Sequence, residues 1–154
     1  MNKSASEVKP FFEELRSAMP RTRTCETVVC APFTALPAAI KAGKECKAAI
    51  GAQDVSEYQA GAYTGQISAE MLTDLGVKYA IVGHSERRAM MSETDSQVNA
   101  KVLMSLENGL IPIICVGENL GEREKGLTMA LVTYQVKSAL AEIGEKDIRK
   151  CVFA

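Results

Sequence analysis

The sequence of 154 residues has no tryptophan, a single histidine and only eight aromatic side chains, four tyrosines and four phenylalanines. Its five cysteines are an odd number, and none of them forms a Cys-x-x-Cys pair. A tetrahedral zinc site needs closely spaced cysteine and histidine ligands, so no metal site is expected. A disulfide framework is also disfavoured, and we expect a reducing, cytoplasmic compartment.

The sequence also lacks an excess of charge of either sign. Eighteen basic and nineteen acidic side chains leave a formal net charge of −1 and a pI near 5.9. This balance provides neither a positive field for a nucleic-acid backbone nor a basic tract for an anionic membrane surface. The longest apolar run, residues 110–116, contains Pro112 and is too short to span a bilayer. The amino terminus lacks a secretory signal pattern. No nucleic-acid or membrane partner is therefore expected.

What the sequence does have is a regular alternation of helical and strand-like segments. Apolar residues at helical spacing predict helices over residues 4–19, 35–42, 68–75, 95–108 and about 132–143. Short apolar runs predict strands over residues 27–31, 48–52, 79–83, 111–116 and 151–154. Continuously apolar strands are typical of parallel sheets that helices cover on both faces. Because no linker divides the chain, residues 1–154 are expected to form a single α/β domain.

Capping residues mark the expected helix ends. Ser4 and Glu7 match a capping box, and Thr34 and Ser68 are expected to cap the second and third helices. Residues 119–126 are rich in charge and are expected to form a solvated loop. Four glycines are expected to follow helices directly: Gly43, Gly76, Gly109 and Gly144.

The pattern alone leaves two closures of the sheet open, an open doubly wound sheet and a barrel. A doubly wound sheet fits the length, but it normally begins with a strand, whereas this chain begins with a helix and ends within a strand-like run. An eight-stranded parallel barrel needs about 250 residues, of which this chain would supply about three-fifths. We therefore expect an incomplete barrel of about five βα units out of eight.

The reactive groups of parallel α/β folds gather at the carboxyl ends of the strands. His84 follows Gly83 at such an end, and residues 85–88 are expected to form the first turn of a helix. Because a helix amino end disfavours further positive charge, the imidazole is expected to stay neutral. A neutral imidazole can donate a hydrogen bond to a carbonyl group and relay protons. The competing interpretation is a histidine that backbone groups satisfy at a strand end.

Other polar groups have two interpretations as well. Glu86, Arg87 and Arg88 could belong to an active-site network or to an ion-pair lattice that braces a loop, and their chemistry favours the lattice. Cys115 could be a nucleophile, but no second histidine is present to activate it, so a packed thiol is favoured. The glycines that follow residues 51–54 match no nucleotide-binding motif, so no nucleotide cofactor is expected.

One run of residues resembles a known signature. The segment Tyr79-Ala80-Ile81-Val82-Gly83-His84-Ser85-Glu86-Arg87-Arg88 is similar to the active-site signature of the triosephosphate isomerase family. Further matches follow the family's order over essentially the whole chain: Met1-Asn2, Cys30-Ala31-Pro32-Phe33, Gly51-Ala52-Gln53-Asp54, residues 61–68 and Ile114-Cys115-Val116-Gly117-Glu118. The chain departs from the family at Met91-Ser92-Glu93, where an aromatic residue followed by Gly-Glu is common.

The resemblance implies part of a (β/α)8 TIM barrel and a glycolytic and gluconeogenic isomerase. The implied substrates are the triose phosphates dihydroxyacetone phosphate and D-glyceraldehyde 3-phosphate, with no cofactor or metal. His84 would be the catalytic electrophile, with Ser85 beside it and Glu86 as a buried carboxylate that organises the site. Cys115 would be a packing residue. The loop Tyr63-Thr64-Gly65-Gln66 would reach into the partner subunit of a homodimer.

The same resemblance implies that several parts of the family's site fall outside these 154 residues. They are a lysine on the family's first strand, a glutamate base just past Ala154, after the strand that begins at residue 151, the phosphate-gripping lid and the family's last two strands. The 154 residues alone are therefore expected to be inactive and either to aggregate or to be molten. Two rival hypotheses are a non-catalytic βα half-barrel with an assembly or binding role and another phosphate-binding βα enzyme.

Overall fold

The computed structural model describes residues 2–20 and 24–154. Its five parallel strands form one sheet in the order of the chain. They are β1 (Val28–Ala31), β2 (Ala49–Ala52), β3 (Tyr79–Val82), β4 (Ile111–Ile114) and β5 (Val152–Phe153). The register pairs Val28 with Ala49 and Tyr79 with Ile111. The predicted parallel α/β sheet is therefore confirmed, and each predicted strand is present at slightly shorter length.

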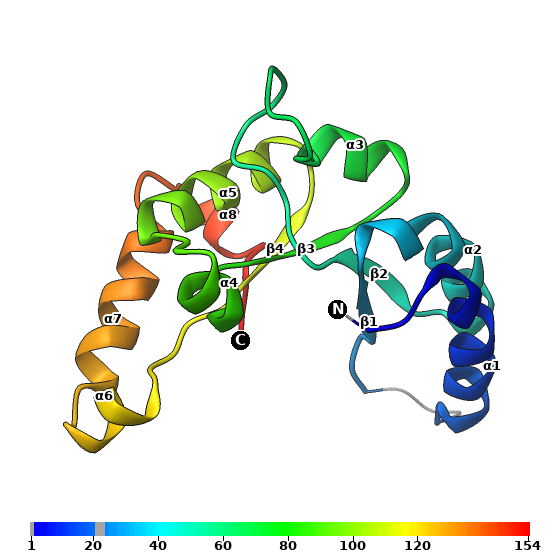
Figure 1. The fold of residues 1–154 in the computed structure, drawn as a ribbon, viewed down its shortest axis with the longest axis horizontal. Helices are drawn as coiled ribbons and strands as arrows, with labels where there is room; N and C mark the ends of the chain where they lie inside the picture. The colour runs from blue at the N-terminus through cyan, green and yellow to red at the C-terminus, as the bar shows by residue number, and fades with distance from the viewer. Residues whose placement is uncertain (1, 21–23) are drawn as a thin grey trace.

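Helices connect the strands (Figure 1). In that view α1 and α2 lie beyond one end of the sheet, and α5, α7 and α8 lie toward the other. The full set consists of η1 (Ala5–Glu7), α1 (Val8–Ala18), η2 (Phe33–Ala35), α2 (Leu36–Cys46), α3 (Ala69–Asp74), α4 (Ser85–Met90), α5 (Asp95–Glu107), α6 (Leu120–Glu124), α7 (Thr128–Ala139) and α8 (Glu145–Ile148). None of the helices in the described part of the chain has the length and apolar character needed to cross a membrane.

The core lies between the sheet and its helices. Val82 and Ile114 are fully buried and join one apolar cluster with Val98 and Val102 of α5. Ile81 and Ile113 alternate with these positions along the strands and are only half-buried. The prediction that both faces of the sheet are buried therefore holds for the helix-covered face and only in part for the other, where Tyr79 is buried but Ile81 and Ile113 are not.

Two predicted helix ends are confirmed by their hydrogen bonds. The backbone N–H of Ser4 donates to Glu7 over 2.8 Å, as expected of a capping box. The Ser68 hydroxyl accepts a hydrogen bond from the N–H of Met71 at the start of α3. Pro10 lies in the first turn of α1, where its missing N–H costs little. The predicted strand remnant at Met1 lies outside the described residues.

The predicted end of the second helix is wrong. Gly43 lies inside α2, which continues to Cys46 and ends with Lys47 in the left-handed conformation at φ 55°. A Cβ atom on Gly43 would lie 2.8 Å from the Ile50 side chain, so this glycine allows α2 to approach β2 closely. Thr34 does not cap α2 either, because it lies within η2.

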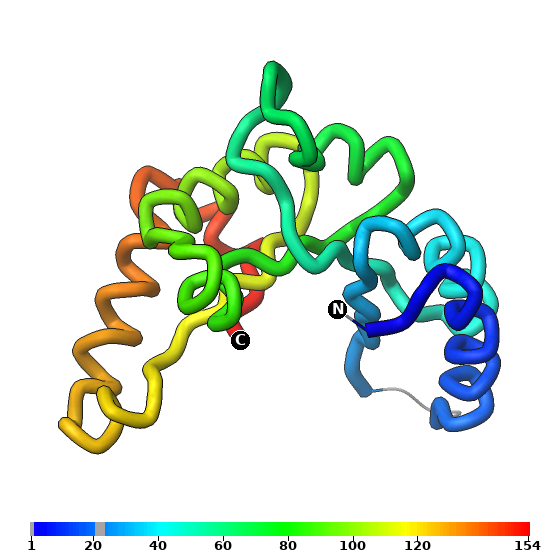
Figure 2. The backbone as a smooth tube through the Cα atoms, viewed as in Figure 1, coloured from blue at the N-terminus to red at the C-terminus, as the bar shows by residue number. Residues whose placement is uncertain are grey.

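The later part of the chain contains two further differences. Residues 119–126 are not a simple loop, because Asn119 and Glu122 form a capping box at the start of α6. The helix predicted to reach residue 143 ends at Ala139, and Leu140 and Ile143 pack against the core after its end. The long excursion of residues 54–66, by contrast, forms neither helix nor strand and stands out from the body (Figure 2).

Candidate functional site

His84 lies at the carboxyl end of β3, where the chain turns directly into α4. The turn is made by Gly83 at φ +69°, and a Cβ atom there would also lie 3.0 Å from the Val98 side chain. Only glycine meets both conditions without strain. His84 is the N-cap of α4, which confirms the helical turn expected after it.

The imidazole of His84 is held through one nitrogen. Its Nδ1 atom accepts a hydrogen bond from the backbone N–H of Glu86 over 3.3 Å. A nitrogen that accepts cannot carry the proton, so this arrangement places the ring proton on Nε2. The side chain is partly exposed, and His84 thus presents a neutral N–H donor at the strand edge. This is the form that the sequence predicts for a carbonyl-polarising group.

The two neighbours of His84 in the signature are exposed. Ser85 is the first residue of α4 and lies at the surface. The Glu86 side chain is 71% exposed, with its carboxylate 3.7 Å from His84 Nδ1. The prediction of a buried Glu86 is therefore wrong for the described chain. The reason is that its position in the first turn of α4 is not covered by another described element.

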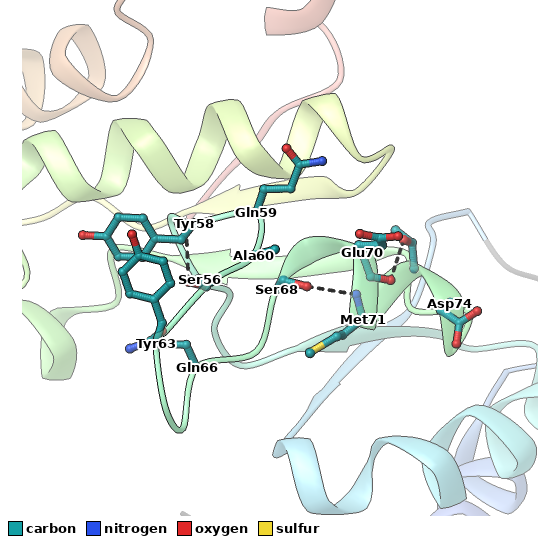
Figure 3. A pocket seen from close by; sticks show the side chains of 12 residues that line it. Ser56, Tyr58, Gln59, Ala60, Tyr63, Gln66, Ser68, Glu70, Met71 and Asp74 are labelled. Carbon is teal, nitrogen blue, oxygen red and sulfur yellow. Dashed lines mark hydrogen bonds between the residues drawn. The ribbon is translucent and has the colours of Figure 1, made fainter.

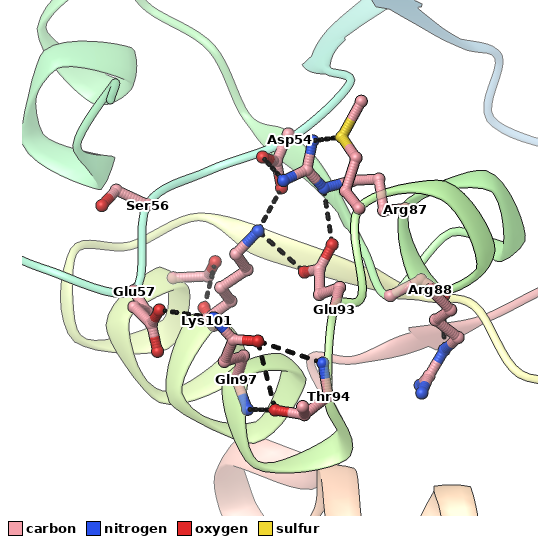
Figure 4. Close-up of polar contacts among 12 residues, drawn as sticks. Asp54, Ser56, Glu57, Arg87, Arg88, Glu93, Thr94, Gln97 and Lys101 are labelled. Atoms are coloured by element: carbon pink, nitrogen blue, oxygen red, sulfur yellow. Dashed lines mark hydrogen bonds and ion pairs between the residues drawn. The ribbon is translucent and has the colours of Figure 1, made fainter. Parts of the chain in front are cut away.

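Arg87 points instead into a cluster of four charges that we call the ion cluster: Asp54, Arg87, Glu93 and Lys101 (Figure 4). Arg87 lies 3.0 Å from Asp54 and 2.5 Å from Glu93. Lys101 Nζ lies 2.7 Å from each of the same two carboxylates. Each cation thus contacts both anions, and the four charges sum to zero.

The ion cluster is largely withdrawn from water. The side chains of Glu93 and Lys101 are 3% and 5% exposed. Charges at such depth are tolerated only when partners replace the lost hydration, as alternating signs do here. The cluster joins Asp54, two residues after the end of β2, to Arg87 of α4 and Lys101 of α5. It confirms the predicted ion-pair lattice for Arg87, whereas Glu86 is not part of it.

Arg88 supports the same helix from another side. Its Nε atom donates to the carbonyl oxygen of Gly83 over 2.8 Å, and its Nη1 atom donates to Asp95 over 2.6 Å. The guanidinium therefore ties the turn before His84 to the start of α5. The sequence does not predict Asp54, Asp95 and Lys101 as partners, because Asp54 and Lys101 are 47 residues apart and no local spacing pairs Asp95 with Arg88.

The cysteines near the strand ends behave as packed thiols. Burial raises the pKa of Cys30 to about 11, and the neighbouring Cys115 adds to the shift. Burial also raises the pKa of Cys115, partly offset by the charge of Arg88. Thiolates are the reactive form, so these shifts disfavour a nucleophilic role and agree with the prediction for Cys115.

The chain beyond β4 is fixed by side-chain hydrogen bonds. Gln135 of α7 accepts from the Gly117 N–H over 2.8 Å and donates to the Gly117 carbonyl oxygen over 3.0 Å. The Glu118 carboxylate accepts from Arg123 over 2.7 Å and from Thr128 over 3.0 Å. These hydrogen bonds, with the one from Arg123 contributing most, lower the pKa of Glu118.

A cavity of about 700 Å³ lies between the 54–66 excursion and α3 (Figure 3). Tyr58 and Tyr63 stack at one side of it, with ring centroids 3.7 Å apart and planes 1° from parallel. Met71 of α3 lines it as well and is 56% exposed. The cavity does not include His84. No group of metal-ligating side chains comes together within residues 2–20 and 24–154.

Comparison with known proteins identifies the family of the chain. The family model for triosephosphate isomerase matches residues 1–154, the whole of the chain. The chain belongs to the triosephosphate isomerase family. A curated relative, "Triosephosphate isomerase" of Acetivibrio thermocellus, is 44% identical over all 154 residues. The chain spans 61% of the length of that relative. The five parallel βα units are accordingly part of a TIM barrel, as predicted.

For a member of the triosephosphate isomerase family, the sequence signature separates into two groups in space. His84 and Glu86 lie together at the carboxyl end of β3. Arg87 and Arg88 turn away and hold α4 in place through ion pairs. The signature therefore contains both the candidate reactive group and the side chains that fix its helix.

Proposed function

We propose that the full-length protein interconverts dihydroxyacetone phosphate and D-glyceraldehyde 3-phosphate in glycolysis and gluconeogenesis. The observation that carries the proposal is the geometry of His84 at the end of β3, whose Nδ1 accepts a hydrogen bond from the Glu86 backbone N–H and thereby leaves Nε2 as the donor. The reaction removes a proton from the carbon next to the carbonyl, the negative charge passes to the carbonyl oxygen in an enediolate, and a proton is then returned to the former carbonyl carbon. A fixed N–H donor at that oxygen stabilises the charge as it forms.

The remaining roles follow from this arrangement and from the family. A carboxylate base removes the carbon-bound proton, and His84 donates to the carbonyl oxygen and relays protons between the two oxygens. Ser85 and Glu86 lie beside His84 in the first turn of α4, and we propose that both take part in catalysis. The family places the base and the charge-balancing lysine outside these residues. An odd number of cysteines without a Cys-x-x-Cys pair supports a reducing, cytoplasmic setting.

We also propose that the full-length protein is a homodimer that assembles through the 54–66 excursion. Tyr63 and Met71 expose apolar surface around the 700 Å³ cavity, and the tip Thr64-Gly65-Gln66 is exposed at the end of the excursion. The base of the excursion is fixed, since the Ser56 N–H donates to the Ile67 carbonyl oxygen over 2.8 Å. A fixed base, with the apolar side chains of Tyr63 and Met71 exposed beside the cavity, suits a surface that a second copy covers.

The test is an isomerase assay on the purified full-length gene product with both triose phosphates as substrates. His84→Gln is expected to keep the fold and to lower turnover by about two orders of magnitude, the usual scale for losing an acid–base partner. Thr133→Ala, at an exposed position of α7, serves as the matched control and is expected to keep full turnover. A wild-type protein without turnover would support the non-catalytic half-barrel instead.

A further inference from the structure

We infer that Gln135 is a positioning residue of the isomerase, which fixes the end of β4 and through it the placement of His84 relative to the chain that follows β5. The inference rests on the proposed function. Its physical basis is a side-chain amide that makes both of its hydrogen bonds to the main chain of one residue, Gly117.

The two hydrogen bonds replace a strand partner. Up to this point β4 is held by backbone neighbours: the Cys115 N–H donates to the Val82 carbonyl oxygen, and the Val116 N–H donates to that of Ala154. At Gly117 the backbone pairing stops, and the Gln135 amide supplies one acceptor at 2.8 Å and one donor at 3.0 Å. An amide presents the same groups as a peptide unit, so Gln135 extends the ladder by one position.

Packing does not hold Gly117 in place. A Cβ atom built on this residue would meet no atom within 4 Å, so the space around it is open. Gln135 itself is anchored, because α7 packs against α5 in the helix layer. Within the described residues, the only hydrogen bonds of the Gly117 main chain itself are the two from Gln135 of α7, so they contribute directly to its position.

The location of this contact gives it a bearing on the reaction. β4 lies between β3 and β5 in the sheet, and His84 follows β3. The proposed function requires a carboxylate base on the far side of the substrate, and the family places it after β5. The end of β4 is then the common neighbour of both reacting groups. A shift of about 1 Å in such a set costs up to about a hundredfold in rate.

The experiment uses the full-length gene product and three variants. Gln135→Met keeps the size of the side chain but removes both hydrogen bonds, Gln135→Glu keeps the acceptor alone, and Thr133→Met is the control on the same helix. We expect Gln135→Met to lower kcat about tenfold while KM changes by less than about twofold, because binding groups lie elsewhere. The kcat of Gln135→Glu should fall between those of Gln135→Met and the wild type, and the kcat of Thr133→Met should match that of the wild type.

A second pair of measurements separates positioning from folding. Amide hydrogen exchange at Gly117 should become at least about tenfold faster in Gln135→Met than in Thr133→Met, since the protecting acceptor is gone. In a His84→Gln background, Gln135→Met should cost clearly less in kcat than it does alone, because residues that act as a unit are not additive.

The outcomes are distinct. An active wild type with full kcat in Gln135→Met overturns the positioning role, even if Gly117 exchange becomes faster. Additive effects of the His84 and Gln135 substitutions overturn it as well. A wild type without isomerase turnover instead overturns the proposed function, and the positioning role with it, whatever the exchange rates are.

Discussion

Lys101 of α5 and Asp54, 47 residues earlier at the end of β2, are joined by a hydrogen bond of 2.7 Å between buried side chains. Lys101 also contacts Glu93, so it neutralises two carboxylates at once. The pair ties the start of the 54–66 excursion to α5.

Lys101→Met should therefore be strongly destabilising in the full-length protein. The substitution leaves Asp54 and Glu93 to share Arg87 alone, and removing one partner of a buried ion pair costs about 3 kcal/mol or more. Denaturant unfolding measures the change in free energy. Lys150→Met is the control, since its pair with Asp147 is exposed and worth no more than about 1 kcal/mol. Equal losses in the two variants would contradict the role assigned to the ion cluster.

Ser92→Gly should stabilise the protein. Ser92 has φ +55°, a left-handed conformation that costs a residue with a Cβ about 1 kcal/mol or more and costs glycine little. Glycine also raises the conformational entropy of the unfolded state, which offsets part of this stabilisation, so a net increase of about 0.5 kcal/mol in the free energy of unfolding is expected. Thermal and denaturant midpoints measure it. Thr133→Gly, in the middle of α7, should instead destabilise by about 0.5–1 kcal/mol, and a loss at both positions would show that Ser92 is not strained.

Glu118 should give the protein a component of acid sensitivity. Its pKa is lowered by the Arg123 hydrogen bond above all, so its contribution is complete above its ordinary value of 4.5 and is lost as pH falls through the lower folded-state pKa. Glu118→Gln removes this component. The stability difference between wild type and variant should be largest near pH 7 and should shrink progressively below about pH 4.5. A difference that stays constant with pH would contradict the assignment.

Thr64→Arg tests the proposed dimer. A bulky charge at the exposed tip of the excursion cannot enter an apolar partner surface without losing its hydration, so dimerisation and isomerase activity should weaken together. Analytical ultracentrifugation and turnover at nanomolar concentration measure both. Lys146→Arg, distant on α8, is the control. A fully active Thr64→Arg dimer at that concentration would remove the loop from the interface.

Residues 1–154 expressed alone should be inactive and should aggregate. β1 and β5 each have one neighbour in the sheet, and Val152 and Phe153 are 43% and 42% exposed. Such edges template association with other chains. Near-ultraviolet dichroism, the sharpness of thermal unfolding and isomerase turnover measure the outcome. A monomer that unfolds cooperatively and turns over triose phosphate would contradict both parts of the prediction.

The sequence predicts those features that neighbouring residues determine together. Apolar runs locate all five strands, because burial selects for them locally, and Ser68 marks a helix start by its own hydrogen bond. Gly43 misleads, since its absent side chain serves contact with Ile50 and not the end of a helix. Asp54, one of the two partners of Arg87, comes from a distant segment, and only the fold brings the two together.

The site shows the same division. The motif identifies His84 and places it at a strand end. It does not predict that Glu86 is exposed or that Gln135 contacts Gly117. Both depend on what the surrounding chain covers. Spacing within a signature indicates chemistry, whereas burial and support depend on elements that the signature does not include.

The order of the sheet has a consequence for synthesis. Since β1 to β5 lie side by side in the sequence in which they are translated, every new strand has its neighbour already in place when it leaves the ribosome. Translation at about 5–20 residues per second leaves seconds for each βα unit to dock before the next is complete. Each strand therefore pairs with the strand translated just before it, and no pairing skips a unit of the sheet. The nascent chain thus exposes one unpaired strand edge for the next unit at each stage, and that edge moves forward with elongation.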